Sequence, residues 1–237
     1  MTKIVVSSNT NQILALLDQT YPEASIALSW RTPWELLVAV ILSAQCTDTR
    51  VNVVTAKLFS KYKTLDDYDR ANPKEFEQDI RSTGFYHNKT KNILTCAHIV
   101  RDRFGGLVPK SMDQILTLPG VARKTANVVL GTAYGIVEGI AVDTHVHRIS
   151  QRLRLVELTK IGGKKLMVFE RDGKTIIDYT KDADPEKIER ELMCVIPRTK
   201  WFPITYLLIS HGRNVCKAGN PNCERCVLRK YCPVSRV

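Results

Sequence analysis

A lysine and an aspartate that together could act on a sugar lie in two short motifs near the middle of the chain. Lys124 belongs to Leu118-Pro119-Gly120-Val121-Ala122-Arg123-Lys124-Thr125, and Asp143 belongs to Ala141-Val142-Asp143-Thr144-His145. A lysine amine attacks carbon only in its neutral form, so it needs a nearby base or surroundings that disfavour the ammonium. A carboxylate could hold the amine, help to remove its proton or stabilise positive charge that develops on the sugar. Taken singly, phosphate binding by Lys124 and helix capping by Asp143 are the simpler alternatives.

Four cysteines near the C-terminus form a second candidate site. They follow the pattern Cys-x6-Cys-x2-Cys-x5-Cys and are Cys216, Cys223, Cys226 and Cys232. The first residues contain no apolar stretch long enough for a secretory signal, so we expect metal ligands here rather than disulfides. Four thiolates suit zinc or an iron–sulfur cluster, and zinc ribbons normally contain two Cys-x2-Cys pairs where this run contains one.

The elements around Lys124 predict two helices joined by a tight hairpin. A short helix is expected over Ser111–Leu116, with Ser111 as its N-cap, and a second helix over Arg123–Tyr134. Pro119-Gly120 separates them. The N-terminus of the second helix would present unpaired N–H groups and the positive end of the helix dipole, which suit a phosphate.

The rest of the chain reads as helix after helix, which predicts a mostly all-α fold. Expected helices cover 11–20, 33–42, 49–62, a segment from 73 to Gly84, 88–104, 144 to about 155, a segment from 185, and 203–211. Thr32 and Asn72 are expected N-caps, and Glu35 is expected to close a capping box with Thr32. Cys46, Cys96 and Cys194 fall in these patterns, where we expect them to pack as small hydrophobes. Residues 160–184 differ, because Asp172-Gly173 between two apolar runs predicts a β-hairpin.

A two-residue turn at Asp172-Gly173 would pair three residues of the first strand with three of the second: Val168 with Ile177, Leu166 with Tyr179, and Phe169 with Ile176. An isolated hairpin is too weakly stabilised to stand alone in water, so we expect one of its faces to dock on the helices that follow Asp143 and Asp184. The alternative is a mobile surface insertion without a function.

The composition indicates a polyanionic partner and no membrane span. Lys and Arg outnumber Asp and Glu by 35 to 24 in 237 residues, which gives a formal net charge of +11. A surplus of this size favours nucleic-acid binding. The longest apolar run, Leu36–Leu42, is far shorter than the ~20 residues that cross a bilayer.

The segment LPGVARKTANVVLGTAYG, followed by IAVDTHVHR, resembles the endonuclease III family of helix-hairpin-helix DNA glycosylases. The resemblance covers almost the whole chain. It implies a two-domain fold with a C-terminal [4Fe–4S] loop: a helical-barrel domain over 26–137, and an iron–sulfur domain over 1–25 plus 138–237. DNA would lie in the cleft between the domains, and the β-hairpin at about 160–184 would be an insertion. Ala122 stands where the family usually has a second glycine.

The resemblance also assigns roles to individual residues. Lys124 would be the Schiff-base nucleophile and Asp143 the essential carboxylate. Gln45 would enter the duplex, and Phe85 would form an apolar wedge beside a flipped nucleotide. Further DNA contacts are expected at Leu118, Gly120, Val121, Ala122, Arg123, Thr125, Arg148 and Lys217. The cluster ligands would be Cys216, Cys223, Cys226 and Cys232.

The implied function is a base-excision-repair DNA glycosylase with AP lyase activity, which removes oxidised pyrimidines and cleaves the strand by β-elimination. Its partner would be double-stranded DNA that contains a damaged base or an abasic site. We expect a monomer in the cytoplasm, associated with the nucleoid and not with a membrane. Two alternatives remain: a monofunctional adenine or mismatch-thymine glycosylase, which generally lacks a lysine at position 124, and a non-catalytic metal-containing DNA-binding module.

Overall fold

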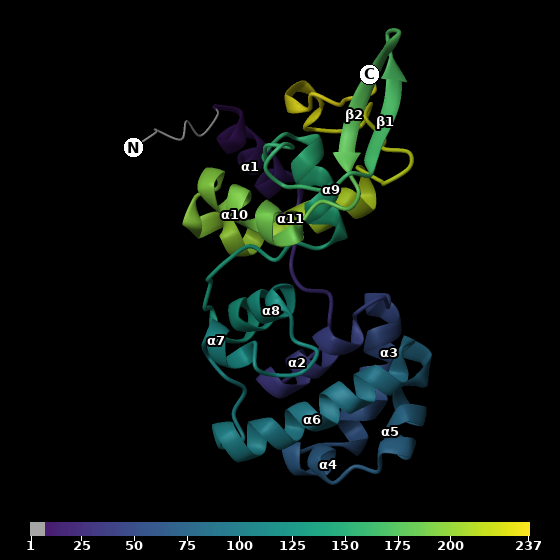
Figure 1. The fold of residues 1–237 in the computed structure, drawn as a ribbon, viewed down its shortest axis with the longest axis vertical. Helices are drawn as coiled ribbons and strands as arrows, with labels where there is room; N and C mark the ends of the chain where they lie inside the picture. The colour runs from purple at the N-terminus through teal and green to yellow at the C-terminus, as the bar shows by residue number, and fades with distance from the viewer. Residues whose placement is uncertain (1–7) are drawn as a thin grey trace. The chain divides into compact units, whose positions relative to one another are not determined.

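The computed structural model describes residues 8–237, which divide into two compact units. The central unit comprises Ile26–Glu138, and the terminal unit comprises the described residues up to Ser25 together with Gly139–Val237. In Figure 1 helices α2 to α8 build the central unit, while α1, α9, α10, α11 and both strands build the terminal unit. The predicted division into functional domains stays a prediction.

The central unit is entirely helical. Its elements are α2 (Pro33–Leu42), α3 (Asp48–Lys61), α4 (Leu65–Asp69), α5 (Pro73–Ile80), a 3-10 turn (Arg81–Thr83), α6 (Tyr86–Phe104), α7 (Met112–Ile115) and α8 (Arg123–Tyr134). Every residue from Glu35 to Leu42 is buried, as expected for a helix that is apolar on all sides. The expected helices of this unit are therefore confirmed, although α5 ends at Ile80 and continues to Gly84 only as the 3-10 turn. Helix α4 was not predicted.

The capping signals work as predicted, with one difference. The side chains of Thr32 and Asn72 accept hydrogen bonds from the first turns of α2 and α5. Glu35, however, does not return a bond to the Thr32 backbone. Its carboxylate accepts from the Arg31 backbone N–H at 2.7 Å and pairs with the Arg31 guanidinium, because that cation lies within reach one residue earlier.

The terminal unit packs its helices around one apolar core. Its elements are α1 (Ser8–Thr20), α9 (Thr144–Arg152), α10 (Pro185–Val195), a 3-10 turn (Arg198–Lys200), α11 (Trp201–Asn214), a 3-10 turn (Arg229–Tyr231) and two strands. Leu17, Val146, Ile188 and Leu208 are among the core residues, so α1 packs with helices from the far end of the chain. Within residues 8–237, no helix is both long enough and apolar enough to span a bilayer.

Two of the three cysteines expected to pack inside helices do not. Cys96 is fully buried in α6, as predicted. Cys46 lies in the turn after α2, because that helix ends at Leu42, and Cys194 is exposed on α10. Helical periodicity alone did not distinguish the buried face of α10 from its exposed face.

The predicted β-hairpin is present. Strands β1 (Leu166–Arg171) and β2 (Lys174–Thr180) pair antiparallel, and Asp172 and Gly173 both have positive φ, as a tight two-residue turn requires. The predicted pairing of Val168 with Ile177 is confirmed, as is that of Phe169 with Ile176.

The predicted pairing of Leu166 with Tyr179 is wrong. A register irregularity lies between Met167 and Val168, so Met167 faces Tyr179 and Leu166 faces Thr180. A bulge of this kind shifts every pair beyond it, and no sequence signal marked its position.

The β-hairpin docks on α9 through polar groups. Asp178 and Thr180 of β2 are buried, and the Asp178 carboxylate accepts two hydrogen bonds of 2.7 Å from the Arg152 guanidinium. The Gln151 side chain bonds both backbone groups of Thr180. Docking was expected on α9 and α10, and these bonds confirm it for α9. Apolar Leu166 and Val168 stay exposed, so the contact with α9 is polar rather than apolar.

Replacing residues 164–180 by a short Gly-Ser linker should lower stability. Arg152 is only 2% exposed and would lose its carboxylate partner. An unpaired buried charge costs about 3 kcal/mol or more, which for a chain of this size lowers Tm by roughly 6–12 °C. Thermal unfolding followed by circular dichroism measures the change. Asp172→Asn, which keeps the turn conformation, is the control, and an unchanged Tm in the linker variant would contradict the docking.

Candidate active site and cysteine cluster

The loop between α7 and α8 is held in place by α6. Gly120 has φ of +77°, and a Cβ there would lie 2.5 Å from the Asn92 amide nitrogen, so the tight packing on α6 requires glycine. The Cys96 thiol donates a hydrogen bond to the Pro119 carbonyl at 3.2 Å. Burial raises the pKa of Cys96 to about 12, which keeps it as the protonated donor. Two side chains of α6, Asn92 and Cys96, therefore hold this loop in place.

The N-terminus of α8 is open to an anion. The N-cap residue Ala122 has no side chain that can accept from the first turn, and Gly120, Ala122 and Lys124 are all exposed. The side chains of Leu118 and Val121 are buried, so at these two predicted DNA contacts only the backbone is available. Arg123 and Thr125 are partly exposed in the first turn of the helix.

Lys124 projects from the first turn of α8 in the central unit. Its side chain is exposed, and among residues 8–237 it forms no hydrogen bond or ion pair. The amine is therefore not engaged in holding the fold together. A lysine in this state is available to a substrate.

Asp143 caps α9 in the terminal unit and keeps one oxygen free. Its Oδ1 accepts hydrogen bonds from the backbone N–H groups of His145 at 2.9 Å and Val146 at 2.8 Å. Its Oδ2 accepts none within the described residues. The capping role of Asp143 is confirmed. The two bonds to Oδ1 orient the carboxylate, and the capping role is compatible with a chemical role for Oδ2.

Gln45 and Phe85 both lie on loops of the central unit in left-handed backbone conformation. Their φ values are +54° and +49°, and both side chains are exposed. Such a conformation costs a non-glycine residue about 1–3 kcal/mol and is concentrated at functional positions. Phe85 is 61% exposed and is therefore not part of the apolar core.

Arg148, one of the predicted DNA contacts, lies inside the terminal unit. It is buried, and its guanidinium donates to the Cys216 carbonyl at 2.9 Å and to the Thr144 carbonyl at 3.3 Å. Burial lowers its pKa. Arg148 therefore supports the cysteine loop from within, whereas Lys217, the next predicted contact, is exposed on that loop.

The four C-terminal cysteines line one cavity of the terminal unit together with apolar residues such as Ile149 and Leu153. Burial raises the pKa of Cys226, and it raises that of Cys232 to about 12, so without a metal these thiols stay protonated. Metal binding would displace these protons and leave thiolates, which accept hydrogen bonds.

Two donors already point at the sulfurs. The Arg152 guanidinium donates to Cys216 Sγ at 3.2 Å. The His211 ring lies with Nδ1 3.1 Å from the Tyr21 hydroxyl and Nε2 3.6 Å from Cys226 Sγ. Burial lowers the pKa of His211 to about 4, with Arg148 adding to the effect, so the ring is neutral at pH 7. If the Tyr21 hydroxyl donates to Nδ1, the ring N–H faces the sulfur.

Arg152 also connects the β-hairpin to the cysteine loop, which sequence reasoning missed. Beside its pair with Asp178, its guanidinium donates to the carbonyls of Lys217 at 2.8 Å and Ala218 at 2.9 Å. Burial by itself would lower the Arg152 pKa, but the hydrogen bonds and charge interactions with Asp178 and Cys216 together raise it. The sequence signal for this link was Asp178 itself, a charged residue that interrupts the apolar run of β2.

Two family models match the chain. The model of the HhH-GPD superfamily base excision DNA repair protein matches residues 38–167, which include Lys124 and Asp143. The iron–sulfur binding domain of endonuclease III matches residues 216–232, which begin and end at a cysteine of the cluster. An endonuclease III of Synechocystis sp. is 46% identical over 222 residues, which are 94% of this chain and 90% of that protein.

The chain belongs to the endonuclease III family. An endonuclease III of Bacillus subtilis is 41% identical and covers 94% of this chain and 93% of its own length. A trapped endonuclease III–DNA covalent intermediate is 40% identical, with a TM-score of 0.79 over 95% of this chain and 96% of that one. A thermostable thymine-DNA glycosylase at 21% identity shares the fold, with a TM-score of 0.75.

As an endonuclease III family member, the chain is a base-excision-repair DNA glycosylase and AP lyase with a [4Fe–4S] cluster. The cysteine cavity fits this cofactor. Within residues 8–237, no three potential ligand side chains converge tightly enough for a single ion. Each cysteine of a [4Fe–4S] cluster binds a different iron atom, so sulfurs that surround a cavity suit the cluster better than zinc.

Asp178→Asn should accelerate loss of the cluster. Asparagine keeps the shape but cannot neutralise Arg152, which then holds Cys216 and the adjoining carbonyls less firmly. Loss of such an outer partner typically weakens metal binding by roughly tenfold. The decay of visible absorption in the presence of an iron chelator, together with iron analysis, measures the rate. Glu170→Gln, at an exposed carboxylate of the same hairpin, is the control, and equal rates would contradict the link.

Proposed function

We propose that this endonuclease III family member removes oxidised pyrimidines from double-stranded DNA through a covalent lysine intermediate. The observation that carries this proposal is the exposed, unpartnered Lys124 in the first turn of an uncapped helix that follows a tight hairpin. Its nitrogen would attack the anomeric carbon of the sugar, and the bond from that carbon to the base would break as the base leaves and takes a proton.

The strand is then cleaved without water acting on the phosphate. Opening of the sugar ring gives an imine between Lys124 and the sugar carbon. Removal of a proton from the neighbouring carbon expels the 3′ phosphate by β-elimination. Hydrolysis of the imine returns the free amine. Asp143 would stabilise positive charge on the sugar and assist proton transfer through Oδ2, since Oδ1 is held by the backbone of α9.

DNA would be held by backbone groups more than by long side chains. The N–H groups at Gly120, Ala122 and the first turn of α8 suit a phosphate, with Arg123 and Thr125 beside them. Gln45 and Phe85 would fill the stack after the damaged nucleotide leaves it. Lys217 on the cysteine loop would add a phosphate contact.

The iron–sulfur cluster would be held by Cys216, Cys223, Cys226 and Cys232. It supplies structural support or redox sensing rather than bond cleavage, because the lysine and the aspartate account for the reaction. Arg152 and His211 stabilise its thiolate ligands. The two compact units would act as the two functional domains of a monomer that works in the cytoplasm on nucleoid DNA.

Lys124→Ala should abolish covalent trapping on abasic DNA in the presence of borohydride. Reduction traps only an imine, and alanine cannot form one. DNA binding should remain measurable, because phosphate contacts supply most of the affinity. Gel analysis of the adduct and a filter-binding measurement follow the two properties. Lys91→Ala, at an exposed lysine of α6, is the matched control, and an adduct formed by Lys124→Ala would contradict the assignment.

Asp143→Asn should keep the fold while removing most turnover. Asparagine caps helices as well as aspartate does, so the bonds to His145 and Val146 can persist. The negative charge is lost, and removal of one such stabilising group commonly slows a reaction by roughly 10²–10³-fold. Single-turnover kinetics and Tm are measured together. Full activity with an unchanged Tm would restrict Asp143 to capping.

A further inference from the structure

Lys89 is a buried cation that the proposed chemistry does not use. It lies in the first turns of α6, and only 4% of it is exposed. Burial lowers its pKa, and no carboxylate among residues 8–237 pairs with it. A buried ammonium is unfavourable unless its N–H groups are satisfied. The groups that accept hydrogen bonds from the Lys89 ammonium therefore indicate its structural role.

Both partners of the Lys89 ammonium are carbonyls at the roots of the two loops proposed to enter DNA. One hydrogen bond of 2.8 Å goes to the Leu42 carbonyl, the last of α2, directly before the loop that carries Gln45. Another of 2.9 Å goes to the Thr83 carbonyl, at the end of the 3-10 turn, two residues before Phe85. Cations are favoured at such helix ends.

The backbone of Lys89 belongs to the same junction. Its N–H donates to the Phe85 carbonyl at 3.1 Å, which begins α6. One residue thus contacts the Phe85 loop twice, through backbone and side chain, and the Gln45 loop once. Gln45 and Phe85 are both in left-handed conformation, which persists only where the surroundings impose it.

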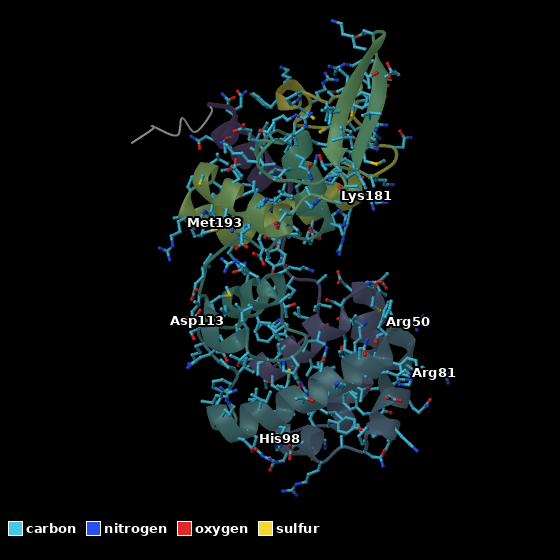
Figure 2. All side chains as sticks on the ribbon, viewed as in Figure 1. Arg50, Arg81, His98, Asp113, Lys181 and Met193 are labelled. Carbon is cyan, nitrogen blue, oxygen red and sulfur yellow. The ribbon has the colours of Figure 1, made fainter. Side chains whose placement is uncertain are left out.

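We infer that Lys89 is a positioning residue that sets the spacing between the Gln45 loop and the Phe85 loop, so that both side chains enter the DNA stack together. The inference rests on the proposed function of these loops. Two side chains that fill one gap in a duplex must match the distance between stacked bases, and small errors of placement have large effects on rate. Arg50 and Arg81 project from the segments next to the two loops (Figure 2), where phosphates would meet them.

The test compares two abasic substrates with the same chemistry. Borohydride trapping rates are measured on a duplex with one abasic site and on the corresponding single strand, which has no partner strand and no gap to fill. Lys89→Met keeps the unbranched side chain but removes every N–H. It should slow trapping on the duplex by about tenfold or more while changing the single-strand rate by less than about twofold. Lys91→Met, at an exposed lysine two residues further along α6, is the control and should match the unmodified protein.

A double-mutant comparison separates positioning from general destabilisation. If Lys89 acts through the loops, Lys89→Met should slow duplex trapping by less than about twofold more in a Gln45→Ala background. Equal loss on both substrates, full additivity with Gln45→Ala, or an unchanged duplex rate would each overturn the inference. If Lys89→Met does not fold, Lys89→Arg, which keeps the charge but alters its reach and geometry, should show the same selective loss to a smaller degree.

The proposed function has its own readout in this experiment. Gln45→Ala and Phe85→Ala should each slow duplex trapping when tested singly. Unmodified rates for both would contradict the proposed role of the loops, and with it the role of Lys89. If either variant is slow while Lys89→Met is not, only the inference about Lys89 fails.

Discussion

Most of the groups of the central unit that are proposed to contact DNA lie on loops, and a loop has no regular hydrogen-bond ladder to hold it. Helix α6 provides what the loops lack. Asn92 packs against Gly120, Cys96 donates to the carbonyl of Pro119, and Lys89 bonds the carbonyls of Leu42 and Thr83. Because these partners are buried and polar, each bond is costly to leave unmade. One rigid helix therefore fixes three separate loops at once.

The terminal unit uses a related device with an arginine in place of a lysine. Arg152 is buried at the end of α9 and donates to Asp178, to a cysteine sulfur and to two carbonyls of the cysteine loop. A guanidinium has five N–H groups in a fixed plane, so it can join a strand to a loop that has little structure of its own. The β-hairpin thereby becomes part of the cluster's surroundings instead of a free surface extension.

The candidate catalytic groups obey a different rule from these supports. Within the described residues, Lys124 forms no hydrogen bond or ion pair. Asp143 accepts hydrogen bonds through Oδ1, and its Oδ2 accepts none from these residues. A group that reacts with substrate must keep hydrogen-bonding capacity that the rest of the protein does not use, but the protein must still orient it. The α9 cap meets both needs for Asp143, since the bonds to His145 and Val146 aim the carboxylate without neutralising it.

The sequence by itself determined most of the helices, the presence of the β-hairpin, the four-cysteine spacing and the family. These features depend on local signals: apolar periodicity, Pro and Gly at helix ends, and short motifs around Lys124, Asp143 and Cys216. Only the tertiary structure decided that Arg148 is buried and that the pairing of β1 becomes irregular after Met167. It also decided that Asp178 pairs with Arg152 and that Lys89 bonds the carbonyl of Leu42. The Arg152 side chain bonds Asp178, which lies 26 residues away in the sequence, and Cys216, which lies 64 residues away. The Lys89 side chain bonds Leu42, which lies 47 residues away. A charged side chain on a helix has the same local pattern whether it meets water or a distant carbonyl, so only the packed chain reveals its partner.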